Sequence, residues 1–231
     1  MRTLRLLATL AVLAPVLAAA PAGAQQVTVG TVQNANCIPF GCDFDVSRYQ
    51  QVYAGGAFGG AAQITSLSFL LGSAPNSFLS PVTYTVRLGY TNAAVGGLNA
   101  ALDANVAGGL TTFATRSFGI GPAAPPVLTF TGLTPFAFDP AAGNLLLDIL
   151  VDGQVGADVG GWASYASDNS GTVTSRAYVQ GGTAGGDETG LVTQFGLVAT
   201  PTSTVPEPTT AVLLGAGLLG VAGVGARRRA R

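Results

Sequence analysis

The sequence predicts an all-β protein: a single antiparallel β-sandwich of jelly-roll type, flanked by an N-terminal signal helix and a C-terminal transmembrane helix. Three observations predict this arrangement. Short segments alternate apolar with polar residues, Gly, Pro and Asn separate these segments, and both ends of the chain are apolar with arginines nearby. Alternating segments with frequent turns indicate packed antiparallel sheets, while apolar ends flanked by arginines indicate export and membrane attachment.

The N-terminal segment, residues 1–24, has the layout of a cleavable signal peptide. Two arginines precede an apolar stretch at residues 6–17, and Ala22 and Ala24 form a small-x-small site. This order predicts secretion with a cut after Ala24. A buried core helix is the alternative, and the two prolines that interrupt the segment disfavour it.

Residues 25–198 predict one β domain, long enough to bury a core of its own. The clearest strand is residues 82–90, where five apolar residues alternate with four polar or small ones. Residues 64–71 show the same alternation, which is typical of a half-buried strand. Further strands are expected at residues 112–120, 127–133, 145–151, 172–179 and 191–198. Residues 92–109 allow either a short helix or a long loop.

Charge and composition exclude several classes of function. Residues 25–204 contain four arginines, no lysine and ten acidic residues, so their net charge is −6. Such a surface argues against a nucleic-acid partner, because binding phosphates needs many cations. The chain contains no histidine, which removes the Ser-His-Asp and Cys-His arrangements and the usual zinc sites.

Cys37 and Cys42 are the only cysteines. An even pair in an exported chain predicts a disulfide, which would contribute roughly 2 kcal/mol by closing so short a loop. A redox or metal-binding pair is the alternative, but the spacing is not C-x-x-C and no further metal ligand lies nearby.

Carboxylates are the remaining candidates for catalysis. Asp148 and Asp152 lie four apart at the end of one expected strand, and Asp43 and Asp45 lie two apart. Glycoside hydrolysis uses such a pair, about 5–9 Å apart, although aspartates in turns usually bond their own backbone. We predict no catalytic residue, and keep a hydrolase as the alternative, for which Asp148 is the first aspartate to substitute.

We consider two ligands, a calcium ion and a sugar ring, as alternatives to the interpretation that these segments are ordinary solvated loops. Residues 168–170 and 187–188 carry oxygen-bearing side chains in glycine-rich loops, which leaves open a calcium site, although no metal or other cofactor is predicted. Trp162, Tyr165 and Tyr178 could form a stacking platform for sugar rings. The simpler interpretation of these aromatic residues is core packing.

A short linker, residues 199–205, leads to a three-part tail at residues 206–231. Its parts are a Pro-Glu-Pro signal (Pro206, Glu207, Pro208), an apolar run at residues 209–226, and a basic cluster (Arg227, Arg228, Arg229). As a helix the apolar run would be roughly 27 Å long, close to the roughly 30 Å of a bilayer core. The arginines predict a cytoplasmic C-terminus.

This tail resembles the PEP-CTERM sorting signal of Gram-negative bacteria, over about 27 of the 231 residues. The resemblance implies an inner-membrane precursor, processing by an exosortase, and a mature form at the cell surface or in the extracellular matrix, where such proteins accompany exopolysaccharide. Residues 48–53 with 64–67, and residues 134–140 running into 143–149, resemble the body of other PEP-CTERM proteins, an uncharacterised β-sandwich group, and imply no active residues. We therefore expect a non-catalytic surface or matrix protein associated with polysaccharide. A carboxylate-dependent secreted glycan hydrolase is the alternative.

Overall fold

A computed structural model describes most of the predicted β domain. The described residues are 23–41, 46–72, 79, 81–119, 123–153, 163–199 and Gly215. The signal segment up to Ala22, the Pro-Glu-Pro signal and the arginine cluster lie outside them. The predicted transmembrane helix at residues 209–226 does too, apart from Gly215. No helix within the described ranges is long and apolar enough to cross a membrane.

The prediction of an all-β domain is confirmed, since the regular elements described between residues 23 and 199 are strands and three short 3-10 turns. The strand pairings among these residues are all antiparallel. One sheet has the order β1 (Ala24–Val29), β13 (Thr193–Ala199), β4 (Ala62–Leu70) and β7 (Val127–Phe138). The second sheet has the order β11 (Thr183–Asp187), β10 (Thr174–Gln180), β3 (Val46–Tyr53), β8 (Asn144–Asp152), β5 (Thr83–Thr91) and β6 (Ala107–Ser117). A small third sheet joins β12 (Gly190–Leu191), β9 (Tyr165–Asp168) and β2 (Asn34–Asn36).

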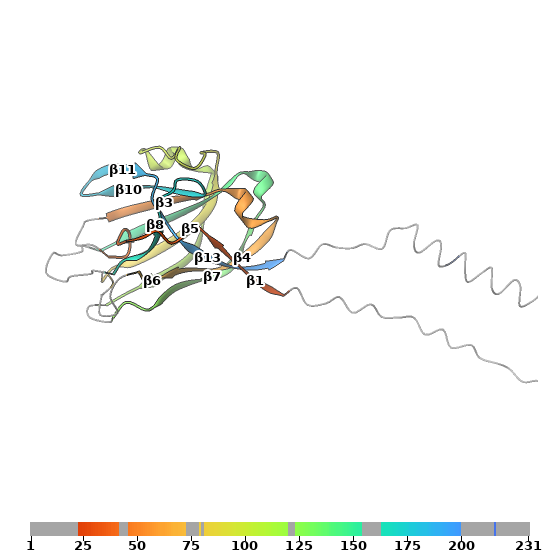
Figure 1. Ribbon diagram of the computed structural model, residues 1–231, viewed down its shortest axis with the longest axis horizontal. Coiled ribbons are helices and arrows are strands. Elements are labelled where there is room, and N and C mark those ends of the chain that lie inside the picture. Colours follow the sequence, from red (N-terminus) through yellow and green to blue (C-terminus); the bar gives the residue numbers. More distant parts are fainter. Residues whose placement is uncertain are drawn as a thin grey trace, which may run out of the picture.

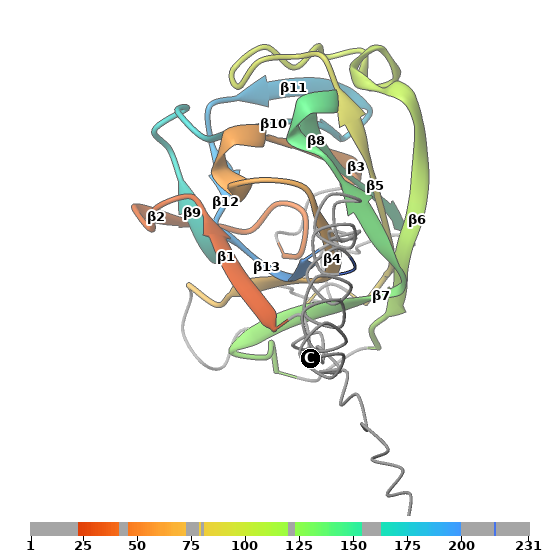
Figure 2. The same cartoon turned by 90° about the vertical axis from the view of Figure 1, so that its right-hand side faces the viewer.

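The two larger sheets face each other around one core, as a sandwich requires (Figures 1 and 2). Tyr53 of β3 meets Phe195 of β13 edge to face, with ring centroids 5.0 Å apart. Tyr84, Val86 and Leu88 are fully buried, so the predicted alternation of β5 is confirmed. The jelly-roll subtype stays a prediction.

The predicted strand at residues 127–133 is too short, because β7 continues through Pro135 to Phe138. In the pairing of β7 with β4, Ile64 faces Phe136 and Ser66 faces Thr131, so a bulge absorbs Pro135. β7 is also the edge of its sheet. At an edge bulge the missing N–H of proline removes no ladder hydrogen bond.

Residues 92–106 form a loop with one 3-10 turn, η2 (Leu102–Asn105), rather than a short α-helix. Two further 3-10 turns, η1 (Gly55–Phe58) and η3 (Pro140–Ala142), connect strands. Asn144 ties the first of these turns to the 92–106 loop: its Oδ1 accepts from the Gly55 amide, and its Nδ2 donates to the Ala93 carbonyl, both at 2.9 Å. These two hydrogen bonds hold the loop beside the start of β8.

The two ends of the domain lie side by side. β1 begins at Ala24, which pairs with Val198 near the end of β13 (Figure 1). The predicted cut after Ala24 therefore falls at the first residue of a paired strand.

The predicted disulfide joins a described residue to one outside the description. A backbone hydrogen bond from the Gly41 amide to the Cys37 carbonyl, 2.6 Å long, closes a turn after β2. No described cysteine is free. Because Cys42 lies outside the described residues, the Cys37–Cys42 disulfide stays a prediction.

Candidate functional site

A charged cluster lies on the face of the six-stranded sheet that points away from the core. Alternation along β8 places Leu147 and Ile149 in the core and Asp148 between them on the opposite face. The strand register places Gln50 of β3 and Arg87 of β5 directly opposite Asp148 on either side. Arg48 stands two residues before Gln50, on the same face.

Asp148 has no solvent exposure and accepts five hydrogen bonds. Arg48 donates through Nε and Nη2 to Oδ2, at 2.9 and 2.8 Å, and Gln50 donates through Nε2 to the same oxygen at 2.6 Å. Arg87 donates through Nε and Nη2 to Oδ1, at 3.1 and 2.5 Å. A buried carboxylate needs this degree of compensation, because desolvation of an unpaired charge costs several kcal/mol.

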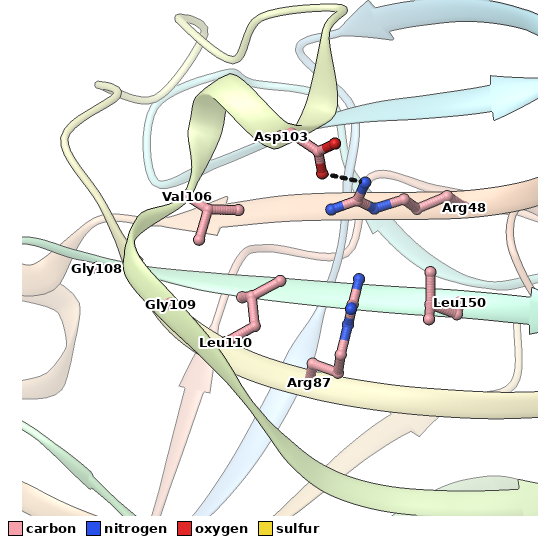
Figure 3. A pocket seen from close by; sticks show the side chains of 8 residues that line it. All are labelled: Arg48, Arg87, Asp103, Val106, Gly108, Gly109, Leu110 and Leu150. Atoms are coloured by element: carbon pink, nitrogen blue, oxygen red, sulfur yellow. Dashed lines mark hydrogen bonds and ion pairs between the residues drawn. The ribbon is translucent and has the colours of Figure 1, made fainter.

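The 92–106 loop lies against the cluster. Asn105 donates through Nδ2 to Gln50 Oε1 at 2.9 Å, while its Oδ1 accepts from the Asn99 amide. Asp103 reaches Arg48 Nη1 at 2.6 Å, although its side chain is 92% exposed (Figure 3). Burial by itself would lower the pKa of Arg48, but the hydrogen bonds to Asp148 and Asp103 outweigh burial and raise it. The hydrogen bond from Arg48 lowers the pKa of Asp103.

The sequence singled out Asp148 but not its partners, and for a different chemistry. A general acid or base must reach the substrate, whereas the oxygens of Asp148 are covered by arginine and glutamine donors. Asp152 is exposed at the far end of β8. Four residues along a strand span roughly 13 Å, which exceeds the separation of glycosidase carboxylates. Asp43 and Asp45 lie outside the described residues.

The structure brings together the two loops that left a calcium site open. An added Cβ on Gly171 would lie 3.0 Å from the Glu188 side chain. However, Asp187 accepts from Arg176 Nε and Nη2, at 2.8 and 2.9 Å. Across the described part of the chain, no group of three or more acidic or cysteine side chains could hold a metal ion.

Asp168 instead fastens two backbone segments. Its Oδ2 accepts from the Thr31 amide and its Oδ1 from the Ser170 amide, both at 2.8 Å. Burial alone would raise the pKa of Asp168, but hydrogen bonds from Ser170 and from the Thr31 amide outweigh burial and lower it. The carboxylate is therefore a structural acceptor that holds the start of the 30s loop against the end of β9.

We expect Asp168→Asn to lower the free energy of unfolding by about 1–3 kcal/mol at pH 7, because an amide can accept only one of the two N–H groups through its oxygen. A lowered pKa means that the ionised carboxylate stabilises the fold above about pH 4 and loses this effect as the pH falls through the folded-state pKa. The difference between the two proteins should therefore shrink at pH 3. Urea unfolding at both pH values, with exposed Asp152→Asn as the control, measures it. Equal midpoints at pH 7 would contradict the role of Asp168.

Of the three aromatic residues considered for a sugar platform, Tyr165 packs in the core, as the simpler interpretation predicted. Its ring is fully buried against Phe40, with ring centroids 5.4 Å apart. Tyr178 is half-buried beneath the guanidinium of Arg176, 5.1 Å from the ring centroid. Trp162 lies outside the described residues.

Sequence reasoning missed that Arg48 and Arg87 converge on Asp148. Arg48 and Arg87 occupy the polar positions of alternating segments, which indicates only that they face away from the core. They are 100 and 61 residues from Asp148 in the chain. Their convergence depends on the strand order β3-β8-β5, for which the sequence contains no local signal.

Comparison with known proteins identifies the tail. The PEP-CTERM protein-sorting motif matches residues 204–229. The match includes the predicted Pro-Glu-Pro signal, apolar run and arginine cluster. No curated protein and no solved structure matches the chain significantly. The chain thus carries a PEP-CTERM protein-sorting motif, the signal of an exported protein that an exosortase processes.

Proposed function

We propose that the mature protein is a non-catalytic component of the cell surface or extracellular matrix that associates with exopolysaccharide. In this proposal the precursor is held in the inner membrane of a Gram-negative bacterium by residues 209–226 until an exosortase processes the tail. The sorting motif supports this route. The adjacent positions of Ala24 and Val198 also support it, because they allow both processing sites to lie beside the membrane.

The observation that carries the non-catalytic part is the environment of Asp148. The carboxylate that seemed best suited to hydrolysis is fully buried, and Arg48, Gln50 and Arg87 occupy its oxygens. Such an arrangement supports a role in organising the sheet face rather than in proton transfer. The exposed Asp152 stands too far along β8 to act with it.

The proposal is tested on protein recovered from the extracellular matrix of its host. We expect mass spectrometry to find a C-terminal peptide that ends between Val205 and Pro208, because the exosortase has removed the remainder. The same protein should co-sediment with the host's own polysaccharide and release no reducing sugar from it. Protein from the inner-membrane fraction, which should retain the complete tail, is the control.

Two results would contradict this proposal. Matrix protein whose peptides run through Ala226 to the final arginines would mean that the tail is a plain membrane anchor. Release of sugar, abolished by Asp148→Asn in protein that still melts cooperatively, would establish the carboxylate-dependent hydrolase instead.

A further inference from the structure

A pocket of about 680 Å³ opens beside the Asp148 cluster. Its charged walls are Arg48, Arg87 and Asp103, and its apolar walls are Val106, Leu110 and Leu150. Figure 3 shows Arg87 rising from β5 between Leu110 and Leu150, while Arg48 extends along β3 towards Asp103. The pocket therefore combines two guanidinium groups with aliphatic surface.

The buried part of this site carries an excess of positive charge. Two guanidinium groups share one buried carboxylate, and their side chains remain 18% and 23% exposed. Arg87 uses Nε and Nη2 on Asp148, and among the described residues its Nη1 has no acceptor. The remaining neutralising charge is Asp103, which is almost completely exposed. Exposed pairs of this kind contribute little to stability, so an external anion can replace Asp103 at small cost.

We propose that this pocket binds the carboxylate of an acidic sugar within the associated polysaccharide. The ligand carboxylate would accept from Arg48 Nη1 and Arg87 Nη1, as carboxylates commonly do from guanidinium groups. Leu110 and Leu150 would pack against the apolar face of the sugar ring. This inference rests on the proposed function, since it names the chemical class of the polysaccharide.

Two features prepare the site for a ligand. Asp148 fixes both guanidinium groups through four hydrogen bonds, so little side-chain freedom is lost when an anion binds. Gly108 and Gly109 have φ of 82° and 149°, and an added Cβ on either would meet no atom within 4 Å. These two glycines thus leave the wall beside Leu110 open for a bulky ring.

The test measures binding of an oligogalacturonate by calorimetry, with a neutral galacto-oligosaccharide of equal length for comparison. We expect the acidic oligomer to bind and the neutral one not to bind. Asp103→Asn should tighten binding about twofold to fivefold, because it removes the internal competitor for Arg48. Asp139→Asn, which removes an exposed acid elsewhere, should change nothing.

Loss of binding is tested at the pocket wall, where folding is least at risk. Leu110→Glu introduces a negative charge on the edge strand β6, and we expect at least about tenfold weaker binding. Arg87→Lys keeps the positive charge but removes the planar guanidinium group that can donate two parallel hydrogen bonds, and it should weaken binding similarly. The matched control is Arg116→Gln, which removes one exposed cation outside the pocket.

Three results would overturn the inference: equal binding of acidic and neutral oligomers, no effect of Leu110→Glu, or binding of monomeric galacturonate without binding of the oligomer. The last would mean a site for small free acids. If the variants bind the oligomer like the parent protein while co-sedimentation with the host polymer persists, the pocket is wrong and the proposed function stands. Absence of co-sedimentation would reject the proposed function itself.

Discussion

Asp148→Ala is expected to lower the free energy of unfolding by about 3–5 kcal/mol, because it leaves two guanidinium groups facing each other without their shared carboxylate. For a domain of this length the loss corresponds to a fall of roughly 6–20 °C in melting temperature. Circular dichroism during heating, repeated with urea at 25 °C, measures both quantities. Neither arginine is fully exposed, so water can only partly replace the carboxylate.

The control for this prediction lies on the same strand. Asp152→Ala removes an exposed aspartate from the end of β8 and should change stability by no more than about 0.5 kcal/mol. Replacing the whole cluster, as Arg48→Met, Arg87→Met and Asp148→Leu together, should recover most of the lost stability, because no buried charge is then left in the cluster. A melting temperature unchanged by Asp148→Ala alone would show that the carboxylate does not organise the arginines.

The sequence predicted the strands with the clearest alternation, but it missed β1, β2, β3 and β9. Residues 82–90 alternate strictly, and β5 lies where that alternation indicates. β11 was not predicted, because its sequence, Thr-Ala-Gly-Gly-Asp, contains neither β-branched apolar residues nor aromatic residues. It forms because the side of β10 away from β3 has backbone groups free to pair with it, and Arg176 lies opposite Asp187 at one end. Tertiary pairing therefore supplied what local propensity lacks.

The candidate site was predictable only as single residues. Asp148 stood out because it lies four residues from Asp152 at the end of one expected strand. Burial of that charge could not be inferred, since it depends on β3 and β5 pairing with opposite sides of β8 and on the 92–106 loop covering the same face. The sorting tail is different, because its three parts are contiguous in the chain and need no folding partner to be recognised.

Phe40 is a loop residue that packs against all three sheets. Its ring is fully buried, although it lies in the connection between β2 and β3. It meets Phe69 and Phe130 of the four-stranded sheet, with centroids 5.0 and 5.8 Å away. It also meets Tyr84 of the six-stranded sheet and Tyr165 of the small sheet, at 5.2 and 5.4 Å. Periodicity cannot indicate such a residue, because the residues beside it form no strand.

We expect Phe40→Ala to lower the free energy of unfolding by about 3–5 kcal/mol, because it leaves a cavity among four aromatic rings. Phe40→Leu should cost less, since it retains most of the volume. Leu133→Ala, at a side chain that is 76% exposed, is the control and should change little. Urea unfolding measures all three variants. If Phe40→Ala unfolds at the same urea concentration as Leu133→Ala, the connection between β2 and β3 is not an anchor, and the sheets are held by strand pairing and the remaining core. If it unfolds earlier, the turn that begins at Cys37 is part of the core.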